Sequence, residues 1–185
     1  MKTLKIASLV VACFFSINLA SAQEKTVMVG GAPMYPSKNI IENAVNSKDH
    51  TTLVAAVKAA ELVTTLQGAG PFTVFAPTNN AFDKLPDGTV ATLLKPENKG
   101  ALQGVLTYHV VAGKVSASEL MSMIKKGNGM ASLKTVAGGT LTAKMDRGKI
   151  MLTDEKGGVS TVTTADVNQS NGVIHVVDKV LLPNS

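Results

Sequence analysis

Hydrophobic positions along this chain follow a helical period early and a strand period late. Apolar residues recur every three or four positions across residues 37–48, 50–60 and 61–67, which predicts three amphipathic helices. Residues 130–165 instead hold short β-branched runs separated by glycine-containing turns, a pattern typical of antiparallel hairpins. Helices followed by hairpins indicate an α+β domain.

Shorter elements extend this pattern. Further helices are predicted over residues 79–85 and 87–94, from Pro96, and from Ser116, which has capping-box spacing with Glu119, to Lys126. The late strands are predicted at residues 132–136, 140–145, 149–153, 159–164, 173–177 and 180–182. Residues 108–111 are predicted as one more strand, in which alternation would point His109 away from Tyr108 and Val110.

Two strand-like runs have distinctive flanks. Residues 72–76 are strand formers stopped by Pro77, and Thr78 then lies where a helix N-cap is expected. Residues 173–177 are apolar except for His175, whose flanks predict a buried and neutral imidazole.

Three motifs occur in order along the chain: Thr-Val-Phe-Ala-Pro-Thr-Asn-Asn-Ala-Phe at 73–82, Tyr-His at 108–109, and Asn-Gly-Val-Ile-His-Val-Val-Asp at 171–178. Together they resemble the fasciclin-like domain family. The resemblance gives as structural signature residues Phe72, Phe75, Pro77, Thr78, Phe82, Asn171, Gly172, His175 and Asp178. It implies a wedge of two small β-sheets with helices packed at the edges, and it places strand 72–76 beside strand 174–177 in the core.

The resemblance also implies an extracellular interaction module without catalysis. In animal members, residues around the Tyr-His pair and an Asp-Ile element are linked to integrin recognition, which makes Tyr108, His109, Asp166 and Val167 the candidate partner-binding residues. For Tyr108-His109 a structural role is favoured, because a strand histidine beside a buried tyrosine usually bonds a backbone carbonyl. For Asp166 the alternative is a turn aspartate that bonds its own backbone.

The N-terminal 22 residues are predicted to be a secretory signal peptide. Lys2 and Lys5 precede a mostly apolar core at 6–19, and Ala20-Ser21-Ala22 has the small residues of a cleavage site. The alternative is a lipoprotein acylated at Cys13. Because the apolar run continues after Cys13, cleavage after Ala22 is favoured, and the protein is expected to be secreted or periplasmic, with association with the cell surface left open.

Composition limits the remaining classes. Residues 23–36 are expected to be an extended lead-in, partly ordered against a single fasciclin-like domain at 37–185. Cleavage removes the only cysteine, so the core must be stable without a disulfide. The net charge is +5 with scattered lysines and no tryptophan, which argues against nucleic-acid binding. No stretch after the leader is long enough to span a membrane.

No catalytic or metal-binding pattern appears. The chain lacks a Gly-x-Ser-x-Gly elbow, and its three histidines do not have metal-ligand spacing. His50 is expected to be exposed at a helix start capped by Asp49. Met121 and Met123 could attract Cu(I), but Met121 is expected on the inward face of its helix, which favours core packing. We therefore expect no enzyme activity, cofactor or metal.

The sequence thus predicts an adhesion module that binds proteins or polysaccharides of an envelope, a matrix such as a biofilm, or a host. The alternative is a periplasmic protein that binds a small ligand or a metal. An enzyme on this scaffold would need a Ser/His/Asp arrangement that no spacing in the chain announces.

Cleavage after Ala22 predicts Gln23 as the N-terminus of the exported protein, because signal peptidase requires small residues before the cut. Intact-mass measurement of the exported protein tests this. A mass that places an acylated Cys13 at the N-terminus would contradict it.

Overall fold

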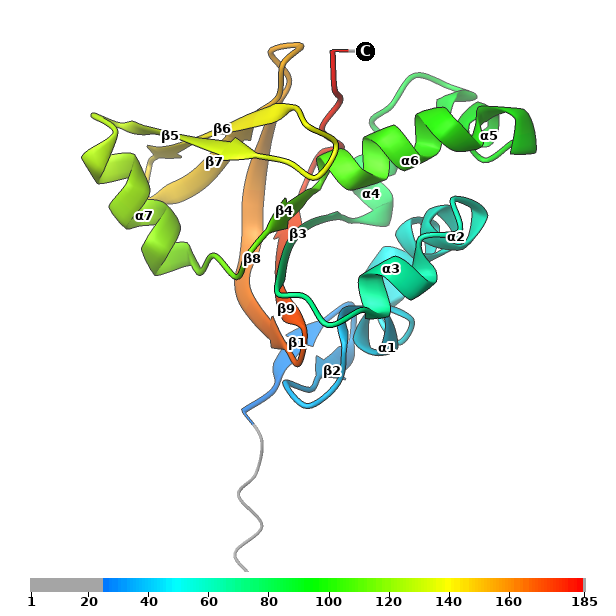
Figure 1. Cartoon of the computed structure of the whole chain (residues 1–185), viewed down its shortest axis with the longest axis horizontal. Helices are drawn as coiled ribbons and strands as arrows, with labels where there is room; N and C mark the ends of the chain where they lie inside the picture. The colour runs from blue at the N-terminus through cyan, green and yellow to red at the C-terminus, as the bar shows by residue number, and fades with distance from the viewer. Residues whose placement is uncertain (1–24, 185) are drawn as a thin grey trace, which may run out of the picture.

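The computed structural model describes residues 25–184, with most helices before most strands (Figure 1). The helices are α1 (Ile40–Ala44), α2 (Thr51–Ala59), α3 (Val63–Gln67), α4 (Asn79–Phe82), α5 (Thr89–Leu93), α6 (Lys99–Tyr108) and α7 (Ala117–Lys126), with 3-10 turns η1 (Lys48–His50) and η2 (Pro96–Asn98). The strands are β1 (Val27–Val29), β2 (Ala32–Met34), β3 (Phe72–Pro77), β4 (Val110–Ala112), β5 (Met130–Lys134), β6 (Thr140–Asp146), β7 (Lys149–Thr153), β8 (Val159–Gln169) and β9 (Gly172–Val177). The predicted α+β class is confirmed. The predicted leader lies outside the described residues.

Seven strands are hydrogen-bonded in the order β4-β3-β9-β8-β7-β6-β5, and β1 and β2 form a separate hairpin. The long β8 changes partner along its length: residues 159–161 pair with β7, and residues 162–169 pair with β9 through register shifts. This change of partner divides the sheet into the two arms of the expected wedge. At the other edge the arms touch, where Val136 N donates to Val110 O at 2.8 Å.

The early and late signature strands lie side by side, as predicted. β3 and β9 pair in parallel over six residues, with Phe75 opposite His175. Both faces of this pair are covered: α1 to α6 lie on one side, and α7 with β5 to β7 lies on the other (Figure 1). The apolar run at 173–177 lacks alternation because all of its residues are buried, on both faces of the strand.

The segment predicted as an extended lead-in is a hairpin in this structure. β1 and β2 pair in antiparallel register, with Val29 opposite Ala32. Val29 and Met34 are buried in the cluster formed by the helices and β3. Residues 27–34 therefore form part of the core. The hydrophobic pattern does not predict this hairpin, because the glycines and prolines of this stretch are typical of an extended segment.

Helix caps agree with prediction in two cases and differ in a third. The Thr78 side chain accepts from Ala81 N at the start of α4, and Ser116 forms the predicted capping box with Glu119 at α7. At α1 the cap is Asn39, which forms a box with Glu42, so the helix predicted from residue 37 begins only at Ile40. Asn39 is the N-cap because only a residue three positions before Glu42 can complete the capping box.

Two further predictions are wrong. Residues 180–182 form no strand, although Val180 and Leu181 are buried, so their apolar pattern reflects packing of an irregular segment. Met121 is 37% exposed, because Leu120 and Ile124 supply the buried face of α7. Within residues 25–184 no helix is long and apolar enough to cross a membrane.

Phe75→Ala should lower the free energy of unfolding by about 3–5 kcal/mol, because it removes a fully buried ring at the centre of the sheet. Urea denaturation measures the loss. Val136→Ala, at a half-exposed position, serves as the control and should change stability by less than about 0.5 kcal/mol. Equal small effects for both variants would contradict the central position of Phe75.

Candidate interaction site

The Tyr-His pair lies at a junction between a helix and a strand. α6 extends through Tyr108, and His109 is its C-cap, with its backbone N–H donating to Leu106 O at 3.1 Å. The predicted strand over 108–111 is therefore wrong in its first half, because Tyr108 is the last residue of the helix and His109 caps it. β4 begins only at Val110.

His109 is held through both ring nitrogens. Nδ1 donates to Val105 O at 2.8 Å, and Nε2 accepts from Leu181 N at 3.0 Å. This pairing requires the neutral imidazole with its proton on Nδ1. Burial lowers the pKa of His109 to about 4, so the ring stays neutral at neutral pH. His109 thus fastens the irregular C-terminal segment to the end of α6.

Tyr108 connects the same helix end to the β-rich arm. Its side chain is fully buried, and its hydroxyl donates to Thr140 O at 2.8 Å and accepts from Glu155 N at 3.2 Å. Asp154, next to Glu155, accepts from Leu182 N at 2.9 Å. The pair and its neighbours therefore join α6, β6 and the C-terminal segment.

The other two candidate residues lie in β8, where Asp166 adopts a left-handed backbone with φ of 57° at a register shift. Its Oδ1 accepts from Ala117 N at 2.8 Å, at the first turn of α7. The predicted alternative, a bond to its own turn, is absent, because the side chain reaches a distant helix instead. The ring of His175 lies beside it: Nδ1 accepts from Asp166 N at 3.3 Å, and Nε2 donates to Val115 O at 2.9 Å.

His175 is completely buried, as its flanks predict. Its ring stacks on Phe75 with centroids 5.6 Å apart. Burial lowers its pKa, and the backbone of Val115 opposes this shift in part.

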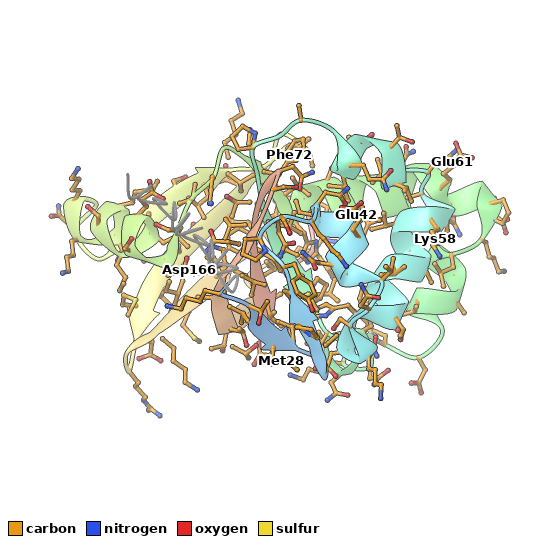
Figure 2. The ribbon with its side chains drawn as sticks, turned by 90° about the horizontal axis from the view of Figure 1, so that it is seen from below. Met28, Glu42, Lys58, Glu61, Phe72 and Asp166 are labelled. Carbon is orange, nitrogen blue, oxygen red and sulfur yellow. The ribbon has the colours of Figure 1, made fainter. Side chains whose placement is uncertain are left out.

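Exposure separates the four candidate partner-binding residues. Tyr108, His109 and Val167 are at most 3% exposed, whereas Asp166 is partly exposed. Figure 2 shows Asp166 on the β-rich side, away from the helices that carry Glu42 and Lys58. Of the four, only Asp166 offers a side chain that a partner can reach in this conformation.

The Asn171-Gly172 signature acts as a clasp between distant segments. Asn171 Oδ1 accepts from Ile40 N at 3.0 Å, and Nδ2 donates to Leu66 O at 2.8 Å. A Cβ on Gly172 would overlap the carbonyl oxygen of Phe72, so the parallel strands can approach only if this residue is glycine.

The remaining signature residues also hold elements of the fold together. Asp178 Oδ1 accepts from Thr161 N at 2.7 Å, which holds the end of β9 against β8. Pro77 and Phe82 are buried around the Thr78 cap, and Phe72 is half-buried. These contacts tie the two sequence motifs to a single framework.

Sequence reasoning missed two buried polar groups. Asn43 Nδ2 bonds Gln169 Oε1, and Asn43 also donates to and accepts from the backbone of Tyr35. The signal available was one asparagine within the apolar stripe of the first predicted helix.

His50 is the second, and its predicted exposure is wrong. Its side chain is 3% exposed because the η1 turn directs it inward, and Ser47, not Asp49, precedes that turn as N-cap. Nδ1 bonds Ser47 Oγ at 2.8 Å, whereas Nε2 has no hydrogen-bond partner. Burial lowers the pKa of His50, and the backbone of Ala76 and the charge of Asp49 oppose this shift in part.

Among residues 25–184, no three His, Cys, Asp or Glu side chains gather as a metal-binding group. Of the three histidines, two use both ring nitrogens in bonds to the backbone. In this site His109 and His175 therefore have structural roles, and the partly exposed group among the candidates is the carboxylate of Asp166.

A model of the family described as Fasciclin domain matches residues 48–183. The chain is 48% identical over 160 residues to Protein sll1483 of Synechocystis, covering 86% of this chain and 82% of that one. It is 34% identical to Immunogenic protein MPB70 of Mycobacterium bovis, with 76% and 66% covered. It is 30% identical to human Periostin over 78% of this chain and 16% of that much longer protein.

A solved structure shows the same fold. The chain superposes on a FAS1 domain pair from the insect cell adhesion molecule fasciclin I with a TM-score of 0.72. The match covers 86% of this chain and 58% of the other at 15% sequence identity. At that identity the likeness concerns the fold alone.

Neutral His109 should make the fold sensitive to acid. Its folded pKa of about 4 lies below the unfolded value of 6.5, so its contribution is fully present above pH 6.5 and is lost as the pH falls toward 4. The loss at pH 4 should be about 3 kcal/mol.

The comparison of wild type with His109→Asn isolates this effect, since His50 and His175, whose pKa values burial also lowers, are present in both proteins. At pH 7 the variant should be less stable by about 1–3 kcal/mol, because Leu181 N loses its acceptor. Urea unfolding at pH 7 and pH 4 should show the difference shrinking by about 3 kcal/mol. A difference that is constant with pH would mean that His109 does not titrate in this way.

Proposed function

The chain belongs to the fasciclin domain family, and we propose that it is an exported, non-catalytic interaction module that binds a protein or polysaccharide of an envelope, matrix or host. Domains of this family are generally adhesion domains without enzymatic activity. The insect relative is described as a cell adhesion molecule, and a mycobacterial relative as a cell surface glycolipoprotein. These names support an extracytoplasmic role.

We propose that recognition centres on Asp166, and its partly free carboxylate is the observation that carries the proposal. Oδ1 is occupied by Ala117 N, and none of residues 25–184 donates to Oδ2. The surrounding bulge is fixed by His175, so the carboxylate is held in place before a partner arrives. Such an oxygen favours a cationic or hydroxyl-bearing group on the partner.

The buried candidates would then support recognition without touching the partner. His175 bonds the backbone of Asp166 and stacks on Phe75, whose backbone N–H donates to His109 O at 2.9 Å. This chain of contacts joins the two family motifs. Changes at Tyr108 or His109 would accordingly weaken binding only through the stability of the fold.

Beads coated with the protein should attach to envelope or extracellular-matrix material from cells that produce it. Asp166→Asn keeps the acceptor for Ala117 N but removes the charge, and should weaken attachment about tenfold. Asp146→Asn, at an exposed position on the far end of β6, is the matched control and should attach like wild type.

Treating the target surface with a protease or with a glycosidase then identifies the partner class, because only one treatment should abolish attachment. Attachment no better than that of an unrelated protein would contradict the proposed function. Normal attachment by folded Asp166→Asn would instead exclude Asp166 from the recognition surface.

A further inference from the structure

An apolar cavity of about 80 Å³ is lined by β3 and the helices α1 to α3, together with residues of the β1–β2 hairpin, α6, β4, β8 and β9. One water needs only roughly 10–15 Å³ by such a measure, so the space exceeds an ordinary packing defect several-fold. Nearly all of its surface is aliphatic or aromatic, as shown by lining residues such as Met34, Ile40, Leu66 and Val74. An apolar cavity of this kind is unfavourable for water and favourable for an apolar guest.

The cavity follows one stripe of the second helix. His50, Leu53, Val54, Val57 and Lys58 all line it, at the three- and four-residue spacing of a single helical face. Eight residues separate the ends of this stripe, which is about 12 Å along the helix axis. Along α2 the lining therefore runs from buried His50 to exposed Lys58, which lies at the rim.

One polar atom in this lining lacks a partner. The Nε2 atom of His50 has no hydrogen bond, although the side chain is 3% exposed. An unsatisfied buried nitrogen is unfavourable, so few such groups occur in native proteins. Ser47 orients the ring through Nδ1, and a Cβ on Gly30 would overlap Ser47 Oγ, so glycine there keeps this support in place.

We propose that this cavity is a binding site for a linear aliphatic alcohol or a lipid that carries such a chain, with its hydroxyl on His50 Nε2 and its methylenes along α2. A hydroxyl both donates and accepts, so it pairs with either neutral tautomer of His50. A chain of about eight carbons matches the length of the helical stripe. Near the rim, the methylenes of Lys58 can cover the chain while its ammonium stays in water. This site is separate from Asp166 and goes beyond the adhesion function.

Calorimetric titration of the purified protein with 1-octanol tests the site. Wild type should bind saturably at one site. His50→Leu keeps the apolar volume but removes the nitrogen, so its affinity for 1-octanol should fall about tenfold, while its affinity for n-heptane should stay unchanged. The ¹⁵N resonance of His50 Nε2 should shift on adding 1-octanol and not on adding n-heptane.

Steric blocking provides the second test. Val54→Phe fills the middle of the stripe and should abolish binding of both probes. Val45→Phe introduces the same ring at a half-exposed position outside the cavity and should bind like wild type. If Val54→Phe does not fold, Ala44→Leu replaces it, since Ala44 also lines the cavity. Absence of saturable binding by wild type, or unchanged binding by the filled variant, would overturn the proposal.

Discussion

The parallel pairing of β3 and β9 is the constraint on which the rest of this structure depends. Phe75 lies opposite His175 in the register and stacks on its ring, 5.6 Å between centroids. Because both faces of this pair are covered, its side chains belong to both hydrophobic clusters at once. A parallel pair needs a long connection, and here nearly one hundred residues between β3 and β9 wrap around the pair before it closes.

Local patterns predicted much of this fold, since they depend on neighbours in sequence. The cap at Thr78, the box at Ser116 and the hairpin strands all follow from short-range chemistry. Predictions failed where distant contacts decide the result. Residues 180–182 have a strand-like pattern but find their backbone partners in His109 and Asp154, which are side chains. No local pattern contains that information.

The candidate site shows the same division. Motif resemblance identified Asn171 and His175, but their partners lie far away in sequence: Asn171 bonds the backbone of Ile40, 131 residues earlier. Such bonds specify how segments meet, so they can be found only from coordinates. Resemblance also could not separate exposed from buried candidates. Asp166 has a left-handed backbone at a register shift, and its side chain bonds the first turn of α7, which is a feature of tertiary pairing and not of sequence.

Burial alone does not distinguish a structural histidine from one that could bind a ligand, as the three histidines of this domain show. His109 and His175 each pair both ring nitrogens with backbone groups, so their desolvation is offset within the fold and their presence requires no ligand. His50 is equally buried but pairs only one. His50 lines the apolar space along α2, whereas the ring of His109 holds the C-terminal segment and the ring of His175 holds β8. The distinction between structural and ligand-directed histidines in this domain therefore depends on hydrogen-bond satisfaction, since burial lowers the pKa of all three.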